Sequence, residues 1–391
     1  MQLPSFLTDL SISPVEYHRL ALEWCKEMRQ TSPVLYDENE EVWLVFCYDD
    51  ALRVRGDYKT FSSENMLANG RGGRSIISMD PPRHRQLRSL ITQAFSARTI
   101  AQMAPQIERI VDELIDRVQA KGEMDWMSDM ANPLPVMVIS DMLGLPREEW
   151  RQFKAWTDAL MSFNPEAVQA QQHFIPYFVQ AIEERRKTPG NDILSLLITA
   201  EIDGERLTYP DLMSFCFTLF IAGNITTTNT LGNAILCFDQ HPEELECLRR
   251  QPELAASAVE EILRTMPPGR VGPNGIIDGR TVTTDAQLGG QQLHEGDRVI
   301  TVALSNNFDE SQFSDPERFN IQRHPNHHLS FGYGIHFCIG APLARLEMKT
   351  VLSKMVQRLP DLHLLHDEPL QVVDSRLMLG PKRLPVAFKA A

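Results

Sequence analysis

The segment FGYGIHFCIGAPLARLE, residues 331–347, is the most informative stretch of this chain. It places Cys338 in a glycine-punctuated loop directly before a run of good helix formers. A helix N-terminus gathers unpaired backbone N–H groups and partial positive charge, so a sulfur held there is shifted towards thiolate, the form that ligates metal. Gly334 and Gly340 flank the cysteine, and glycine suits backbone that lies flat against a large group. The pattern predicts a metal-ligating cysteine beside a broad planar partner, for which haem is the obvious candidate.

The alternative for Cys338 is a small hydrophobic side chain in the core, the commoner role of a lone cysteine. The residues around it argue otherwise. At fixed spacing from Cys338 the segment carries Phe331, Gly334, His336, Gly340, Leu343, Ala344, Arg345 and Glu347. Together they resemble the haem-binding signature of the cytochrome P-450 family. The resemblance implies that Cys338 is the axial thiolate of a haem iron, that the N–H groups after it soften the sulfur's charge, and that Phe331 shields the sulfur from one side.

Length and composition predict one large globular unit. At 391 residues the chain exceeds the usual single-domain size, yet no Gly/Ser-rich linker, repeat or low-complexity tract divides it, so we expect a single domain over residues 1–391. The hydrophobic share of 43% is ordinary for a protein with a sizeable core. The net charge of −14 argues against nucleic acid or an anionic membrane as a partner, although plain solubility is the commoner reason for such a charge.

The chain is expected to be cytoplasmic. Its first residues, MQLPSFLTDLSISPVEY, lack the layout of a signal peptide, and no stretch approaches the ~20 apolar residues that span a bilayer. The six cysteines show no CxxC spacing, which argues against structural zinc and disulfides. Because no N-terminal anchor is expected, the resemblance is to the bacterial type. It implies electrons from NAD(P)H through a reductase and a ferredoxin-like or flavodoxin-like carrier.

Helical periodicity dominates the sequence. Helices are predicted over residues 98–122, 133–143, 211–239, 252–266 and 341–358. Strands are predicted over 42–46 and 296–304. The pattern predicts a mainly α protein with small β-sheets. The resemblance refines it to the cytochrome P-450 fold, an α-rich fold that holds haem b between a long distal helix and a proximal cysteine loop.

The segment FCFTLFIAGNITTTNT, residues 215–230, lies within the longest predicted helix. Ala222 and Gly223 remove side-chain bulk and let a flat group approach the backbone, while threonine hydroxyls can bond a carbonyl one turn earlier and widen the helix. By resemblance this is the distal helix over the haem, and Thr226 falls on the threonine that holds dioxygen and a water. The alternative for Thr226, Thr227 and Thr228 is core packing in a weak helix.

Ile225 departs from the family's pattern, which has an acidic residue at that position to relay protons. Isoleucine cannot carry a proton, so proton delivery must differ. Asn224, Thr227, ordered water or a polar group of the substrate could substitute. Alternatively, peroxide could supply the oxidant together with its protons.

Glu261 and Arg264 stand three residues apart in AVEEILR and can pair on one helical face. Alone, that spacing usually indicates a solvated surface pair. By its place upstream of the cysteine loop it resembles the family's Glu-x-x-Arg motif, whose third member would be Arg323. The resemblance implies that these three residues stabilise the fold and take no part in catalysis.

A third group of residues is predicted to bind carboxylates. His84 and Arg88, in DPPRHRQLR at 80–88, lie one helical turn apart and can face the same anion. The positions of Arg280 and His336 also resemble those of family residues that contact the haem propionates. Four donors would then serve two carboxylates through charge-assisted hydrogen bonds. The alternative, most of all for Arg280, is an ordinary surface role.

The regions that line the substrate cavity in similar proteins are apolar here, which predicts a mainly hydrophobic substrate. The predicted pocket residues are Ile76, Ile77, Leu219, Pro268, Val271 and Met378. Arg71 and Arg74, in the loop before them, could meet a substrate carboxylate, but arginines in such a loop are more often solvated.

The function that the resemblance implies is a haem-thiolate monooxygenase, which inserts one atom of O2 into a C–H or C=C bond. Two alternatives stay open. The missing acid makes a peroxide-driven haem oxidase conceivable, and a haem-bound ligand sensor or carrier would need no turnover.

Overall fold

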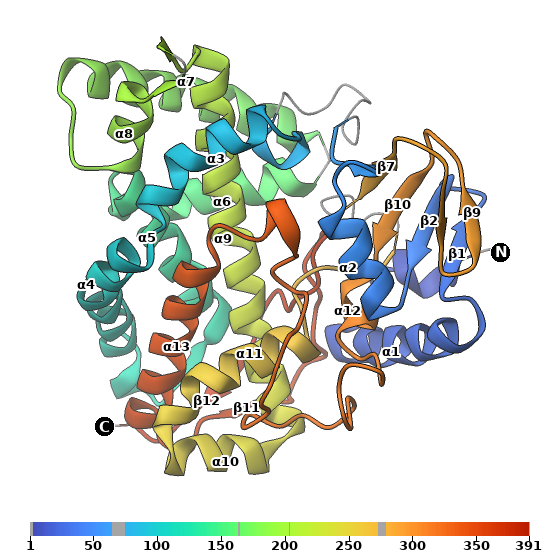
Figure 1. Ribbon diagram of the computed structural model, residues 1–391. Coiled ribbons are helices and arrows are strands. Elements are labelled where there is room, and N and C mark those ends of the chain that lie inside the picture. Colours follow the sequence, from blue (N-terminus) through green and yellow to red (C-terminus); the bar gives the residue numbers. More distant parts are fainter. Residues whose placement is uncertain (1–2, 65–74, 163–164, 203, 273–278, 391) are drawn as a thin grey trace.

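Helices make up most of the chain in the computed structural model, which describes residues 3–64, 75–162, 165–202, 204–272 and 279–390. Arg71 and Arg74 lie outside these ranges. The helices are α1 (Pro14–Thr31), α2 (Tyr48–Gly56), α3 (Arg83–Ala94), α4 (Ala97–Asp116), α5 (Pro133–Leu143), α6 (Trp150–Ser162), α7 (Glu166–Lys187), α8 (Ile193–Thr199), α9 (Tyr209–Gln240), α10 (Pro242–Arg250), α11 (Ala255–Thr265), α12 (Ala303–Asn306) and α13 (Ala341–Arg358). Figure 1 shows α9 running through the middle of the helical part, with α13 beside it.

The strands are short and form small sheets. They are β1 (Val34–Asp37), β2 (Val42–Val45), β3 (Phe61–Ser62), β4 (Glu123–Asp125), β5 (Glu201–Ile202), β6 (Glu205–Arg206), β7 (Arg280–Val282), β8 (Ala286–Leu288), β9 (Gln291–Leu293), β10 (Arg298–Thr301), β11 (His363–Leu364) and β12 (Pro385–Ala387). The largest sheet has the order β1-β2-β10-β7-β3, and a second has the order β11-β12-β4. In Figure 1 the larger sheet lies on one side of the molecule with α1 next to it. Strands from both ends of the chain therefore meet in one sheet.

The helix α9 is fixed at its start and buried along its length. Thr208 caps it, and Thr208 and Asp211 exchange side-chain and backbone hydrogen bonds as a capping box. From Asn224 to Phe238 every side chain except that of Thr226 is buried. A helix that is buried on all sides needs neighbours on all sides, and α5, α6, α7, α11 and α13 all contact it. This burial leaves Thr226 as the one opening in that stretch.

The predicted helix boundaries mostly match the structure, with one early ending. The prediction of a helix over 133–143 coincides with α5, whereas the helix predicted to run to Gly122 ends at Asp116. A 3-10 turn, Gln119–Lys121, follows, and Gly122 then takes a φ of 74°. The chain turns there into β4, so the apolar pattern continues past the helix itself. Within the described ranges, no helix combines the length and the apolar character needed to cross a membrane.

A buried ion network joins α11 to the segment before the cysteine loop. The side chains of Glu261 and Arg264 are both fully buried and form two hydrogen bonds of 2.8 Å. Arg323 donates its Nε to Glu261 at 3.1 Å, and Asn326 donates its amide at 3.0 Å. Arg264 also donates to the carbonyl of Asn307. The predicted spacing thus forms a buried network in place of a solvated surface pair.

We expect Glu261→Gln to lower the free energy of unfolding by about 3–5 kcal/mol, because it leaves two buried guanidinium groups without their counter-charge. The measurement is urea unfolding of the purified protein. Glu16→Gln is the control, since Glu16 pairs with Arg19 in solvent and its loss should barely move the midpoint. Equal shifts of the unfolding midpoint in Glu261→Gln and Glu16→Gln would contradict the stabilising role assigned to the Glu261 network.

Candidate active site

The cysteine loop holds the sulfur of Cys338 at the start of α13. A 3-10 turn, Gly334–His336, precedes the cysteine, whose own N–H donates to the carbonyl of Phe331 at 2.8 Å. The backbone N–H groups of Gly340 and Ala341, at the start of α13, act to lower the pKa of this thiol, and the N–H of Ala341 donates to the carbonyl of Cys338 at 3.3 Å. Cys25, Cys216 and Cys237 are buried in the core, whereas Cys338, like Cys47 and Cys247, is only partly covered. The loop therefore leaves the sulfur of Cys338 accessible to a bound group.

The pKa of Cys338 corrects the prediction that its position alone favours thiolate. Burial raises the pKa of the thiol, and the two N–H groups with Arg88 and Arg345 only partly oppose that effect. Desolvation outweighs the helix N-terminus here. A coordinating metal removes the proton outright, so the thiolate needs its metal partner.

Gly334 has a reason to be glycine that differs from the prediction. Its φ is 72°, and a Cβ there would lie 2.5 Å from the carbonyl oxygen of Arg55 in α2. The glycine therefore lets the loop cross the backbone of α2. A Cβ on Gly340 would meet the sulfur of Cys338 at 3.9 Å, an ordinary contact.

Two histidines face each other between α3 and the loop. The rings of His84 and His336 lie 4.3 Å apart between centroids. Within the described part of the chain, neither buried Nε2 atom has a hydrogen-bond partner. Burial, followed by the charge of Arg88, lowers the pKa of His84 to about 4; burial, followed by the charge of Arg280, lowers the pKa of His336 to about 3. Both rings are therefore neutral at pH 7, and an anion placed beside them would raise both pKa values.

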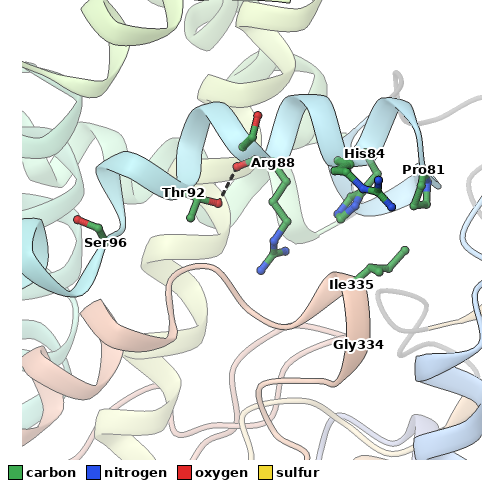
Figure 2. Close-up of a pocket in the computed structure, with 9 residues that line it drawn as sticks. Pro81, His84, Arg88, Thr92, Ser96, Gly334 and Ile335 are labelled. Carbon is green, nitrogen blue, oxygen red and sulfur yellow. Dashed lines mark hydrogen bonds between the residues drawn. The ribbon is translucent and has the colours of Figure 1, made fainter.

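The arginines predicted beside these histidines also lie close to the loop. Arg88 donates to the carbonyl of Phe337, next to Cys338, and Figure 2 shows its side chain reaching from α3 towards the loop that carries Ile335. Arg280 begins β7, is buried, and donates to the carbonyl of Gly279 at 2.7 Å. Its charge contributes to the lowered pKa of His336. The structure thus brings all four predicted carboxylate-binding residues to one place.

A cavity of about 640 Å³ opens between α3 and the cysteine loop (Figure 2). It is lined by Pro81, His84, Arg85, Arg88, Ser89, Thr92, Ser96, Gly334 and Ile335. The lining carries two arginines, one histidine and three hydroxyl groups but no carboxylate. This side of the loop therefore suits an anionic group.

The helix α9 supplies the other side of the site. Ala222 is exposed and Thr226, one turn later, is half-buried, within a helix that is otherwise mostly covered. The hydroxyl of Thr226 donates to the carbonyl of Ala222 at 2.8 Å, and that of Thr230 donates to the carbonyl of Thr226. These are the predicted bonds to a carbonyl one turn earlier. Gly223 faces elsewhere, because a Cβ there would lie 3.3 Å from Ile139 in α5.

Asn224 points away from Ala222 and Thr226. Its side chain is fully buried, and its amide nitrogen donates to Thr157 of α6 at 2.7 Å. Thr228 lies on the same side and donates to the carbonyl of Ala131 at 2.9 Å. The structure therefore does not bring Asn224 together with Thr226.

Ile225 lies in a small apolar cluster. It is 6% exposed and groups with Leu377 and Met378, against which Met161 and Ile221 pack. The position that is acidic in the family's pattern thus carries an apolar side chain among apolar neighbours. Sequence reasoning missed Met161 and Leu377, although the four-residue spacing of Ile221 and Ile225 could have indicated that they share a face.

The predicted pocket residues fall into two groups. Met378 joins Ile225, Leu219 is buried on α9, Ile76 packs on the main core and Ile77 is 42% exposed. A hydrogen bond of 3.0 Å between the hydroxyls of Ser75 and Thr218 ties their segment to α9.

Val271 and Pro268 lie elsewhere. Val271 is buried in a separate core cluster with Leu7 and Tyr17, on the side of α1. Pro268 is half-buried and accepts the N–H of Leu379. The structure therefore does not place Val271 in one cluster with Met378.

Comparison with known proteins identifies the class to which this fold and site belong. Residues 136–388 match the sequence model of the family "Cytochrome P450". The chain is 41% identical over 360 residues to the putative cytochrome P450 YjiB of Bacillus subtilis (strain 168), covering 89% of each protein. It is 36% identical to the cyclomarin C epoxidase CymV of Salinispora arenicola (strain CNS-205), covering 94% of this chain and 95% of that protein. The crystal structure of CYP109E1 from Bacillus megaterium in complex with testosterone is similar with a TM-score of 0.85 and 38% identity, covering 94% of this chain and 99% of that one.

The chain belongs to the cytochrome P450 family. It is a haem-thiolate monooxygenase that acts on organic substrates, with haem b as cofactor and electrons that come indirectly from NAD(P)H. The predictions of the family and of its α-rich fold with small sheets are confirmed.

The residues of the site fit haem. A partly covered sulfur at a helix N-terminus suits an iron ligand, and the exposed Ala222 leaves room for a flat group beside α9. The unpartnered Nε2 atoms of His84 and His336, with Arg88 nearby, suit the acceptor oxygens of carboxylates.

We expect His84→Leu to speed the loss of haem by roughly 10-fold, because one charge-assisted hydrogen bond to a carboxylate is worth about 1.5 kcal/mol. His84→Gln keeps a donor and should lose haem more slowly than the leucine variant. The measurement is transfer of haem to a haem-free globin. His294→Leu, at an exposed position, is the control and should match the parent protein. A His84→Leu rate equal to that of the control would remove His84 from the haem site.

Proposed function

We propose that the chain inserts one atom of O2 into a C–H or C=C bond of a mainly apolar substrate, with Cys338 as the axial ligand of the haem iron. The observation that carries this proposal is the place of Cys338, whose partly covered sulfur lies at the start of α13 in a loop fixed by the hydrogen bond from its own N–H to the carbonyl of Phe331. Haem bound there would carry out the oxidation, while the protein orients the reactants and excludes water.

Three further parts of the chain would hold the haem. We propose that His84, Arg88, Arg280 and His336 bind its propionates, as the unpartnered Nε2 atoms of the two histidines and the positive charges of Arg88 and Arg280 beside His336 support. Ala222 would lie against one face of the ring. Phe331, Gly334 and Gly340 would shape the loop on the other face, since the Phe331 carbonyl holds the N–H of Cys338.

Thr226 is proposed to place a water or the O2 substrate beside Ala222. Its hydroxyl hydrogen is already used by the Ala222 carbonyl, so its oxygen remains an acceptor on the partly open side of α9. Water held there could carry protons without a carboxylate at position 225. Asn224 would act indirectly, by fixing α9 to α6 through Thr157.

The substrate is proposed to be mainly apolar. Met378, Leu219 and Ile76 support this, because each is at least partly buried among apolar neighbours near α9. The apolar cluster around Ile225 would extend the same wall. The role of Pro268 would be to anchor the 377–379 segment through its carbonyl, and Val271 would support that segment from the side of α1.

We also propose that a ferredoxin-like or flavodoxin-like carrier, reduced from NAD(P)H by its reductase, docks at the cavity between α3 and the cysteine loop. Arg85 and Arg88 with no carboxylate in the lining suit an acidic carrier, although the whole chain carries a charge of −14. The cytoplasm is the proposed location, since all six cysteines are free, as a reducing compartment keeps them.

Residues 1–391 are proposed to form a single domain. The main core contains residues from Met79 to Phe388, and β2 pairs with β10 from the other end of the chain. Both features favour one folding unit.

The proposal is tested by the spectrum of the reduced protein with carbon monoxide. Thiolate ligation by Cys338 should give the absorption typical of this family, and Cys338→His should shift it to that of histidine-ligated globins while haem stays bound. An unchanged spectrum in the variant would show that another residue ligates the iron.

We expect Thr226→Val to lower the fraction of NAD(P)H that yields product by roughly 10-fold, because it removes the hydroxyl acceptor on the partly open side of α9. Any substrate that changes the haem spectrum by displacing the iron-bound water can be used. The release of peroxide is measured together with the formation of product. Thr230→Val is the matched control, since Thr230 makes the same bond one turn later but is buried. Equal uncoupling in both variants would count against the proposed role.

A further inference from the structure

A closed network of three side chains lies beside Phe331, on the cysteine loop. Arg345 of α13 donates to Glu260 of α11 through two hydrogen bonds, of 2.8 and 2.7 Å. His328, just before the loop, approaches the same carboxylate at 3.2 Å and is almost fully buried. The guanidinium of Arg345 also lies over the ring of Phe331, at 4.5 Å from its centroid. The network ties two helices to the residue whose carbonyl holds the N–H of Cys338.

The hydrogen bonds define the charge of this network. The backbone N–H of Ser330 donates to Nδ1 of His328 at 3.2 Å, so Nδ1 carries no proton. The proton of the neutral ring is then on Nε2, which donates to Glu260. Burial alone would raise the pKa of Glu260, but the bonds from Arg345 and His328 outweigh it and lower the pKa to about 2. One negative and one positive charge remain, and the network as a whole is neutral.

Arg345 lies near the sulfur of Cys338, because its guanidinium is 4.5 Å from the ring centroid of Phe331, whose carbonyl accepts the N–H of Cys338. Glu260 holds an equal and opposite charge against that guanidinium. We infer that Glu260 and Arg345 are a balanced charge pair beside Phe331, in which each charge cancels the other's effect on how readily the iron bound at Cys338 accepts an electron, with His328 fixing the carboxylate. This inference rests on the proposed role of Cys338.

A purely structural tie between α11 and α13 makes a different prediction. If the pair only held the helices together, loss of either partner would loosen the loop in the same way. If the pair balances charge, loss of the two partners must act in opposite directions. Reduction adds one negative charge at the iron, so a lone guanidinium favours it and a lone carboxylate opposes it.

The test compares the reduction potentials of Glu260→Gln and Arg345→Gln in the haem-loaded protein. We expect Glu260→Gln to raise the equilibrium constant for one-electron reduction by about threefold to tenfold, and Arg345→Gln to lower it by a similar factor. At 59 mV per tenfold, these changes are roughly 30–60 mV in each direction. The double variant should return close to the parent value. Shifts of the same sign, or no shift in either variant, would overturn the inference.

Two further variants separate charge from geometry. Arg345→Lys loses the paired bonds and the stacking on Phe331 but keeps the charge. Because the charge is kept, its equilibrium constant for one-electron reduction should stay within twofold of that of the parent protein. Arg358→Gln removes the same charge at the far end of α13, where Arg358 pairs with Asp112. That end lies about 20 Å along the helix, beyond the ~8 Å screening length, and should leave the potential unchanged. An Arg345→Lys potential like that of Arg345→Gln would indicate a structural role only.

The proposed function is checked separately on each protein. If the reduced carbon monoxide complex of the parent protein lacks the thiolate spectrum, Cys338 is not the iron ligand, and this conclusion does not depend on the reduction potentials of the variants. A parent protein with that spectrum and same-sign shifts in the variants would leave Cys338 in place and overturn only the charge pair.

Discussion

The site depends on a sulfur whose surroundings favour the protonated form. Burial raises the pKa of Cys338, and the N–H groups of Gly340 and Ala341 do not fully compensate. The thiol is therefore favoured here until a positive partner such as iron binds. The same two N–H groups still matter, because they lie where they would take up part of the sulfur's charge once it forms. Binding of the metal and formation of the thiolate are then one coupled step.

Two neighbouring carboxylates of α11 hold the loop that carries this sulfur. Glu261 points into the fully buried network with Arg264 and Arg323, which fixes the chain before the loop. Glu260 points to the other side and binds Arg345, on the helix that follows the loop. Adjacent residues on a helix face different directions, so one short stretch of α11 can hold both ends of the cysteine loop. The position of the sulfur thus depends on charges that are spread over residues 260–345 of the sequence.

The sequence predicts the loop side of this site better than the α9 side. Cys338, His336, His84 and Arg88 lie together as predicted, since fixed spacing in a short loop and one helical turn leave little freedom. The faces of α9 could not be assigned in this way. Almost every side chain from Asn224 to Phe238 is buried, so no apolar stripe distinguishes the side of the site from the side of α5 and α6.

The consequences of that uniform burial are visible at single residues. Gly223 was predicted to make room for a cofactor but faces Ile139, and Asn224 faces Thr157. The orientations of these two residues depend on contacts with α5 and α6, and residue spacing within α9 cannot predict such long-range contacts. The tautomer of His328 is a similar case, because it is set by Ser330 and Glu260 together.

The apolar cluster at Ile225 changes where protons could travel. A carboxylate among Leu377, Met378 and Met161 would be costly to ionise, so the residues around position 225 disfavour an acid as much as the isoleucine itself does. The isoleucine and its apolar neighbours are therefore consistent with each other. Together they make an ionised group unfavourable on that side of α9. The partly open hydroxyl of Thr226 is on the other side, one residue further along. With the role proposed for Thr226, protons would arrive through water in contact with its hydroxyl, and the amount of water admitted with each substrate would be part of the reaction.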